Sequence, residues 1–502
     1  MARTFGIVFG YSGQLLIALS CFLILPLFVD FIYGEYHQSY ETTLAFVLPA
    51  AAALLLGISC YFLFAKETPN KLQATLICSV SWLVFSALGA IPYVLAINSS
   101  YLDGFFEAMS GFTTTGITMF TGLDYMPRSI IFWRALTQWI GGLGILTMFM
   151  VVVFKGGSTH RLFGAEGHKI AVSRPVPGLA HTVKILFTIY VGLTLVIAVA
   201  LYALDVSLFD SICHSFATLS TGGFSPYDAS IDYYRLSGHS HYISIQYVLI
   251  LGMIMGGTSF AVHYRLLKGN WRALGDNLEI RYWWTLIAIF LALIFLERSV
   301  KIEPIWKLSL SSPRFWHELE ESLRSVLFQV VSIITTFGTR DIGTSYFGEG
   351  ARQLFLVMMV IGGCVGSTSG GIKVLRIAIL NRLIRREVYR VRVPAQVVSR
   401  VVIDGELVPL DEIQRVGGLF FMWIVLLIFG GGVTEYLSHY SGYAALSGMF
   451  SALGNIGPCY IPAAEMGQLH PLIKIVYILG MLAGRLEILP VLLLFNLKAW
   501  SS

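Results

Sequence analysis

Long apolar runs separated by short polar turns fill this chain, and their lengths predict two kinds of helix. Two long runs, 5–33 and 41–65, come first and predict two membrane-crossing helices. After them, one set of features occurs four times: a long apolar run, a run of about a dozen residues, a glycine-bearing loop, and a second long run. A dozen helical residues extend about 18 Å, which is too short for a hydrocarbon core of about 30 Å. We therefore predict that the short runs enter the membrane and turn back.

The predicted fold is an all-α polytopic membrane protein in which two N-terminal helices precede four helix–pore-loop–helix repeats around a pseudo-fourfold pore. The predicted units are 1–66 for the two extra helices, 67–175 for pore repeat 1, 176–275 for pore repeat 2, 276–395 for pore repeat 3 and 396–502 for pore repeat 4. The helices expected inside the repeats lie at 72–98, 102–112 and 129–154; 182–204, 208–219 and 242–267; 283–297, 319–334 and from 351 onward; and 415–437, 443–453 and 471–497. This pattern gives ten crossings and four re-entrant segments.

Composition excludes most other classes of protein. The 502 residues are 56% hydrophobic and 13% charged, with a mean hydropathy of +0.73, which a soluble globule with a solvated surface does not reach. The first apolar run is longer than the core of a signal peptide, so we expect it to remain as a membrane helix. The six cysteines are scattered without a CxxC pair, which favours small buried residues over disulfides or metal ligands.

The distribution of charge predicts the orientation. Basic residues between 66 and 281, together with a cluster at 373–392, fall on one side under this count, which makes that side cytoplasmic and places the N-terminus there. No soluble domain accompanies the cluster, which argues against a nucleic-acid partner. Acidic residues fall near the opposite mouth, where carboxylates would concentrate cations. They are Asp103, Glu107, Asp124, Asp210, Asp228, Asp232, Asp341, Glu349 and Glu465.

Four loops carry similar residues at matching places in the repeats. Glycine lets the backbone approach an axis closely and leaves carbonyl oxygens facing inward. A ring of carbonyl oxygens replaces the hydration shell of a monovalent cation, and hydroxyl groups before the glycines add a further layer of oxygens. One such loop is typical of an ordinary turn, but four at matching places favour an ion filter. The loops are Thr114-Thr115-Gly116, Ser220-Thr221-Gly222, Thr336-Phe337-Gly338 and Asn455-Ile456-Gly457.

A single arginine stands inside the last long apolar run. Arg485 lies near the middle of its predicted helix, where an ionised guanidinium is costly, so we expect it to face the pore or a water-filled cavity. An ion pair with Glu487 is disfavoured, because residues two apart on a helix point in different directions.

A glycine-rich segment interrupts the third outgoing helix. Five glycines in ten residues do not continue a stable helix, so the segment is predicted to be a flexible plug. A phosphate-binding loop is disfavoured there, because Ile372 intervenes before Lys373 and a membrane helix precedes the segment, so we expect this chain itself to bind no nucleotide. The segment comprises Gly362, Gly363, Gly366, Ser367, Thr368, Ser369, Gly370 and Gly371, with Lys373 after it.

The sequence leaves two other classes of protein as alternatives to a channel. A membrane enzyme would use His239 and His241 as metal ligands or Ser367 and Ser369 as nucleophiles, but no HExxH or GxSxG motif occurs. An inverted-repeat transporter would need units of opposite orientation, whereas each unit here has two crossings.

Five strings carry a resemblance to a known family. They are GFTTTGIT (111–118), LSTGGFSP (219–226), GGCVGSTSGGIKVLR (362–376), GNIGP (454–458) and GRLEILP (484–490). The chain resembles the TrkH/KtrB/HKT superfamily over essentially its whole length, and its two extra N-terminal helices are similar to the TrkH/TrkG branch of potassium-uptake subunits. Phe337 departs from the family pattern, in which a threonine is usual.

The resemblance implies a channel-like, potassium-selective uptake subunit in the bacterial cell inner (cytoplasmic) membrane. In the family a glycine of each filter loop marks potassium selectivity, and Gly116, Gly222, Gly338 and Gly457 match. The family also implies a potassium ion at the filter, a gating loop at 362–371 and a cationic barrier at Arg485. The implied partners are membrane lipid, a second copy of the chain in a homodimer, and a separate cytosolic TrkA-like ring of NAD/ATP-binding domains. A sodium- or proton-coupled symporter of the same fold is the alternative.

Overall fold

The protein is described by a computed structural model over residues 2–37, 40–64, 67–144, 179–302, 311–338, 347–394 and 399–501. Within these ranges the regular structure is helical apart from one short antiparallel pair, β1 (Val402–Ile403) and β2 (Glu406–Leu407). Six of the described helices are long and apolar enough to cross a membrane, or up to seven spans if the bent pair α12–α13 counts as one. The predicted all-α polytopic class is confirmed.

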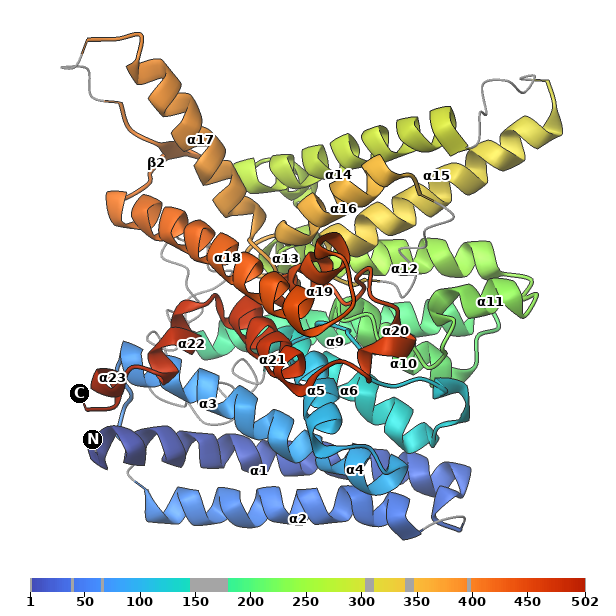
Figure 1. Cartoon of the computed structure of the whole chain (residues 1–502), viewed down its shortest axis with the longest axis vertical. Coiled ribbons are helices and arrows are strands. Elements are labelled where there is room, and N and C mark those ends of the chain that lie inside the picture. Colours follow the sequence, from blue (N-terminus) through green and yellow to red (C-terminus); the bar gives the residue numbers. More distant parts are fainter. Residues whose placement is uncertain are drawn as a thin grey trace.

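Two helices, α1 (Ala2–Tyr33) and α2 (Tyr40–Leu63), lie side by side at one edge of the molecule (Figure 1). Their backbones approach closely, because a β-carbon on Gly13 or Gly57 would lie within 3.0 Å of the other glycine's carbonyl oxygen. The turn after α1 holds this pair against the next helices. There the Glu35 carboxylate accepts hydrogen bonds from the Ser129 backbone at 3.2 Å and from the Ser129 hydroxyl at 2.6 Å.

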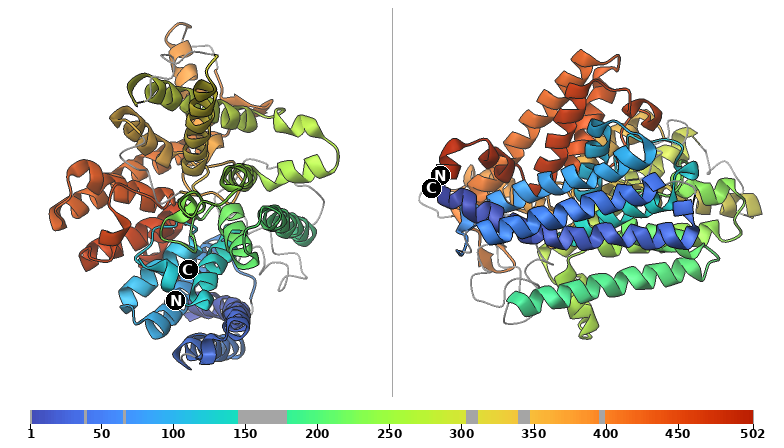
Figure 2. Two further views of the ribbon diagram at one scale, coloured as in Figure 1. Left: turned by 90° about the vertical axis from the view of Figure 1, so that its right-hand side faces the viewer. Right: turned by 90° about the horizontal axis from the view of Figure 1, so that it is seen from below.

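The other helices form four sets in chain order. The first contains α3 (Lys71–Gly89), α4 (Ile91–Ile97), α5 (Tyr101–Phe112) and α6 (Arg128–Leu143); the second contains α9 (Leu179–Tyr202), α10 (Leu208–Leu219), α11 (Tyr233–Leu236), α12 (Tyr242–Gly257) and α13 (Phe260–Leu267); the third contains α14 (Leu278–Glu297), α15 (Pro313–Ile334), α16 (Glu349–Val360) and α17 (Val374–Arg390); and the fourth contains α18 (Leu410–Leu437), α19 (Gly442–Gly454), α20 (Ala463–Met466), α21 (Pro471–Leu486), α22 (Leu489–Leu494) and α23 (Leu497–Ser501). Figure 2 (left) shows the sets following one another around the centre of the molecule. One large apolar cluster joins the first and fourth sets to α1, and another joins the second and third sets.

The short helices begin at serine caps. Ser100 and Ser207 accept hydrogen bonds from the backbone N–H groups of Asp103 and Asp210, which fixes the starts of α5 and α10. These two helices have 12 residues each, and α19 has 13. The predicted half-length runs are therefore correct for three sets.

The third short helix is longer than predicted. α15 has 22 residues and begins at Pro313, whereas the apolar run predicted a start near 319. Ser312 caps the helix through the Arg314 N–H, and proline suits a first helical turn. Arg314, His317 and Glu318 interrupt the apolar residues of the first two turns, so these turns do not form part of a continuous apolar run.

The outgoing helices are broken where the sequence predicts continuous ones. The expected helix at 242–267 consists of α12 and α13, which meet at 105°. The expected helix at 471–497 ends at Leu486, and Glu487 and Ile488 both have positive φ before α22 begins. In the first set, α6 ends at Leu143, and the predicted continuation to 154 lies outside the described residues.

Each of these breaks follows glycines that pack on a short helix. A β-carbon at any of these glycines would lie within 3.0 Å of a carbonyl oxygen near the end of that helix, so the two backbones touch. The pairs are Gly141 with Phe112, Gly256 with Leu219, and Gly484 with Leu453. The hydropathy of the outgoing runs gives no sign of this contact, which explains why the breaks were missed.

Candidate ion site at the four central loops

The four central loops share one backbone conformation. In each, a non-glycine residue with positive φ is followed two residues later by a glycine with positive φ. Left-handed backbone is uncommon outside glycine, so its recurrence indicates a common structural requirement. The pairs are Thr114 (53°) and Gly116 (86°), Thr221 (54°) and Gly223 (80°), Thr336 (61°) and Gly338 (62°), and Asn455 (54°) and Gly457 (107°).

The loops also share their hydrogen bonds with the preceding helices. In the first loop, Thr114 N–H donates to Gly111 O at 2.9 Å and Thr115 N–H donates to Ser110 O at 2.8 Å. Bonds with the same spacing start at Thr221 and Gly222, at Thr336 and Phe337, and at Asn455 and Ile456. Each loop therefore turns back directly at the C-terminus of α5, α10, α15 or α19.

This pattern shifts the second predicted triplet by one residue. The equivalent of Thr114-Thr115-Gly116 is Thr221-Gly222-Gly223, whereas the sequence predicted Ser220-Thr221-Gly222. Two glycines stand next to each other in this loop, and only Gly223 has a positive φ. Composition alone does not distinguish them, which explains the shift.

The four positive-φ glycines touch the neighbouring loops and close a ring. A β-carbon on any of them would lie within 3.0 Å of a carbonyl oxygen of the next loop, so a larger residue would force the backbone to move. Each oxygen belongs to the residue just before the glycine of its own loop. Gly116 faces the oxygen of Gly222, Gly223 that of Phe337, Gly338 that of Ile456, and Gly457 that of Thr115. The contacts pass through all four loops and return to the first.

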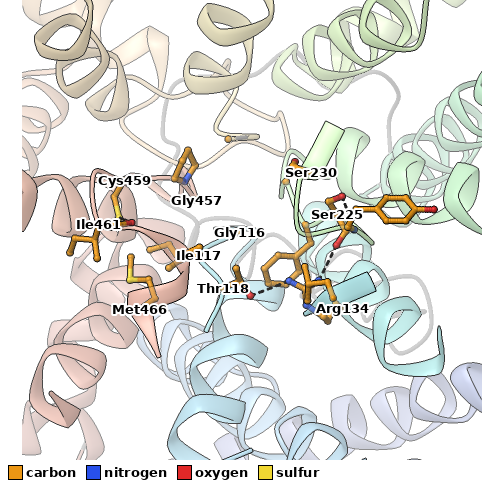
Figure 3. Close-up of a pocket in the computed structure, with 17 residues that line it drawn as sticks. Gly116, Ile117, Thr118, Arg134, Ser225, Ser230, Gly457, Cys459, Ile461 and Met466 are labelled. Atoms are coloured by element: carbon orange, nitrogen blue, oxygen red, sulfur yellow. Dashed lines mark hydrogen bonds between the residues drawn. The ribbon is translucent and has the colours of Figure 1, made fainter. Parts of the chain in front are cut away.

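An open cavity lies directly over this ring. All four positive-φ glycines line it, and Gly222 is not among its lining residues. Figure 3 shows Cys459, Ile461 and Met466 on one wall, and Arg134 with Ser225 on the opposite wall. The cavity therefore gives access to the four glycines from one side of the ring.

The predicted acidic mouth needs correction at several positions. Glu107 is fully buried and forms an ion pair with Arg134 at 2.8 Å, so it does not face the cavity. Arg134 also donates to Ser225 O at 3.0 Å, which ties the first loop's helix to the second loop. Asp103 pairs with Lys474 at 2.5 Å, and Asp210 accepts a bond from the Tyr227 hydroxyl at 2.8 Å. Asp341 lies outside the described residues.

The glycine-rich segment 362–371 lies against the other end of the loops. Gly370 N–H donates to the Thr336 hydroxyl at 2.8 Å, and a β-carbon on Gly370 would lie 2.6 Å from Asn455 Cβ. The Thr368 hydroxyl donates to Leu219 O at 2.8 Å and lies 3.4 Å from the Thr221 hydroxyl. The segment thus contacts the second, third and fourth loops on the side away from the cavity.

Several hydrogen bonds hold the segment in this place. Cys364 N–H donates to Gly257 O at 2.9 Å, Thr368 N–H donates to Gly256 O at 3.1 Å, and Gly363 N–H donates to the Ser369 hydroxyl at 2.5 Å. Gly362 and Gly371 lie where the chain folds back on itself, since a β-carbon on either would lie within 3.0 Å of the other strand of the segment. Between them the chain turns at Val365 and Gly366, where Ser367 N–H donates to Cys364 O at 3.1 Å. The segment is folded and bonded here, and its flexibility stays a prediction.

Arg485 bridges this segment to the first set of helices. It lies in the last turn of α21 rather than near the middle of a long helix, because the helix ends at Leu486. Its guanidinium donates to Thr368 O at 2.6 Å, to Gly141 O at 2.5 Å and to Gly142 O at 3.0 Å. Gly141 and Gly142 lie in the last turn of α6, where carbonyl oxygens lack the usual helical N–H partner four residues ahead.

Two residues of the predicted basic cluster are not on the surface. Arg376 is buried and pairs with Glu487 at 2.5 Å, a partner 111 positions away. The Lys373 ammonium donates to the Ser369 carbonyl. The exposed part of the cluster therefore begins further along α17, at Arg382 and Arg385.

Two residues that the sequence did not single out support the second loop and the glycine-rich segment. Gln138 on α6 bonds both sides of the second loop, through Gly222 O at 2.6 Å and Phe224 N at 3.0 Å. Glu279, at the start of α14, accepts the Val365 N–H at 2.7 Å. Gln138 lies inside a predicted apolar run and Glu279 lies just before one, and a polar residue at such a place is the signal that could have found them.

The two histidines that a membrane enzyme would use as metal ligands lie near each other, but in the described ranges they belong to no metal-binding group. His239 accepts a bond from the His241 N–H at 3.2 Å, and His241 lies 3.5 Å from Asp205. Within the described ranges, no group of three or more His, Cys, Asp or Glu side chains is placed to hold a metal ion. All six cysteines are free thiols.

Comparisons with known proteins agree with this architecture. The family model TrkH, described as "Cation transport protein", matches residues 44–501. "Trk system potassium uptake protein TrkH" of Escherichia coli K12 is 30% identical over 97% of this chain and 98% of that protein. "Uncharacterized cation transporter MJ1485" of Methanocaldococcus jannaschii is 29% identical over 96% of this chain and 94% of that protein.

A solved structure has the same fold. The crystal structure of the potassium transporter TrkH from Vibrio parahaemolyticus superposes with a TM-score of 0.83 at 29% identity, covering 99% of both chains. The TrkH family consists of transporters, so the membrane-enzyme alternative is discarded. The chain is a multi-pass membrane protein, and it belongs to the TrkH family of cation transport proteins.

Proposed function

We propose that this chain is the translocating subunit of a potassium-uptake system and conducts potassium ions through the glycine ring. The observation that supports this most is the closed series of contacts in which each positive-φ glycine faces a carbonyl oxygen of the next loop. The relatives named as Trk system potassium uptake proteins support the choice of ion.

The chemistry of the ring suits a monovalent cation. Backbone oxygens replace water around a potassium ion at little cost when their positions are fixed in advance. The helices α5, α10, α15 and α19 all end at the loops, so the partial negative charge of four helix C-termini points toward the ring. Neither contribution depends on a titratable side chain.

The glycine-rich segment and Arg485 fit a gate. The segment lies on the far side of the ring from the cavity, and Arg485 places a fixed positive charge beside it. A cation leaving the ring in that direction has to pass both. Movement of the segment would therefore open the pathway without changing the ring.

Control of this gate would come from outside the chain. We propose that a cytosolic ring of nucleotide-binding domains docks on the exposed basic part of α17, which continues from the segment and projects from the molecule (Figure 1). The proposal includes a homodimer in the bacterial inner membrane, with the N-terminus and α17 on the cytoplasmic side.

Growth of a bacterial strain that lacks its own potassium-uptake systems tests the function. Expression of this chain should restore growth at limiting potassium, and the Gly116→Ser variant, at equal membrane abundance, should restore it less well. Equal growth of both, or failure of the wild-type chain to support growth with its regulatory partner present, would contradict the proposal.

A further inference from the structure

Gln138 holds the second central loop from both sides. It lies on α6 and is fully buried, although it belongs to a helix of the first set. Its Nε2 donates to Gly222 O at 2.6 Å, and its Oε1 accepts from Phe224 N–H at 3.0 Å. One side chain thus fixes the backbone on both sides of the positive-φ Gly223.

This contact explains why residue 222 is glycine. Gly222 does not have a positive φ, so its conformation does not require glycine. A β-carbon there would instead lie 2.4 Å from Gln138 Cδ, and its three nearest atoms would all belong to the Gln138 amide. The two adjacent glycines therefore serve different purposes: Gly223 turns the chain, and Gly222 makes room for the amide.

The second and fourth sets place no such side chain at the equivalent position. Gly141, Gly256 and Gly484 are equivalent, because each faces the carbonyl that lies two residues before a positive-φ residue. Three residues before these glycines the chain has Gln138, Met253 and Met481, and both methionines are fully buried. A thioether donates no hydrogen bond, so among these three positions only Gln138 can hold a loop in this way.

The bonded oxygen belongs to the ring itself. Gly222 O faces Gly116, in the same relation that the oxygens of Thr115, Phe337 and Ile456 have to their neighbouring glycines. Among the described residues, those other three oxygens accept no side-chain hydrogen bond, whereas Gly222 O accepts one from Gln138. The ring therefore has one oxygen that is tied to a membrane helix.

We propose that Gln138 is a positioning residue for ion selectivity, which it sets by fixing the Gly222 carbonyl and sharing its electron density. The inference rests on the proposed function of the ring. Without the amide, the carbonyl would move more freely and present a stronger field to the ion. A more adaptable cage of oxygens and a stronger field from those oxygens both favour the smaller sodium ion. Loss of the amide is therefore expected to lower the potassium-to-sodium selectivity, whether selectivity depends on cavity size or on field strength.

The test replaces the amide by the residue that the equivalent positions use. Gln138→Met removes both hydrogen bonds at similar volume, and Met253→Leu in α12 is the matched control. With purified protein in liposomes, we expect Gln138→Met to lower the potassium-to-sodium permeability ratio several-fold while potassium flux persists, and Met253→Leu to keep the wild-type ratio. A wild-type ratio in folded Gln138→Met would overturn the inference. A wild-type chain that does not distinguish the two ions would instead overturn the proposed function.

If Gln138→Met does not fold, a second pair of variants tests the contact between Gln138 and Gly222. Gly222→Ala places a methyl group against the amide, so it should lower the permeability ratio or the yield of folded protein. Truncating the amide in the double variant Gly222→Ala/Gln138→Ala should relieve the collision, and folded yield should recover relative to Gly222→Ala alone. Additive losses in the double variant would show that the two positions do not act through each other.

Discussion

Replacement of Arg485 by alanine should open the pathway without changing its selectivity. The guanidinium joins the glycine-rich segment to the end of α6, through Thr368 O at 2.6 Å and Gly141 O at 2.5 Å. Alanine removes this link together with the positive charge. The ring of positive-φ glycines lies beyond the segment and is not touched by the change.

The structure sets the size of the effect. A hydrogen bond to a charged group contributes about 1.5–3 kcal/mol. If opening of the segment breaks the bond from Arg485 to Thr368 O, prior loss of that bond shifts the balance between closed and open segments by roughly 10- to 140-fold, at 1.4 kcal/mol per factor of ten. Basal flux should therefore rise by about tenfold or more, up to the limit at which every channel is open.

Potassium flux in liposomes, measured without any partner, is the assay. Arg485→Lys is the matched variant: it keeps the charge, but a single ammonium does not reach both carbonyls as the fork of arginine does. We expect its flux to fall between wild type and Arg485→Ala. A folded Arg485→Ala with wild-type flux would refute the reasoning, and a changed permeability ratio would place Arg485 in the ring rather than beneath it.

Three further outcomes follow from the same geometry. Gly116→Ser and Gly223→Ser each put a side chain against a ring oxygen at a positive φ, so each should lower the potassium-to-sodium permeability ratio; unchanged reversal potentials in both would remove the ring from the account. Deletion of 366–370 should raise basal flux and blunt the response to nucleotide with the regulatory ring present, and a shortened, folded protein that kept both wild-type values would end the gating proposal. Reversing charge at Arg385 and Arg386 should weaken binding of that ring in a pull-down while basal flux stays unchanged, and undiminished binding would move the docking surface elsewhere.

Local signals predicted the short helices well. The apolar runs 102–112 and 208–219 gave α5 and α10 almost to the residue, because serine caps and turn residues bound them on both sides. α15 was predicted too short, since charged and polar residues interrupt the apolar pattern of its first turns. The breaks in the outgoing helices were missed, because they depend on backbone contacts such as that of Gly256 with Leu219 rather than on hydropathy.

The candidate site was predictable only as far as its local sequence pattern reached. The predicted positions of Thr114, Thr336 and Asn455 agree with the backbone angles. The second loop was shifted by one residue, because Gly222 and Gly223 are adjacent and only their backbone angles distinguish them. Contacts between residues distant in sequence could not be predicted. The sequence places Arg376 in an exposed basic cluster, whereas the structure pairs it with Glu487, 111 positions away. The role of Gln138 is not apparent from the sequence for the same reason, since Gly222 lies 84 positions along the chain.

The most direct test of the central claim is the reversal potential of the purified chain in planar bilayers with potassium on one side and sodium on the other. We predict a potential close to the potassium equilibrium value, carried by this chain alone and shifted toward zero by Gly116→Ser. A potential near zero for the wild-type chain, or one that persists unchanged in Gly116→Ser, would contradict the claim that the glycine ring selects potassium.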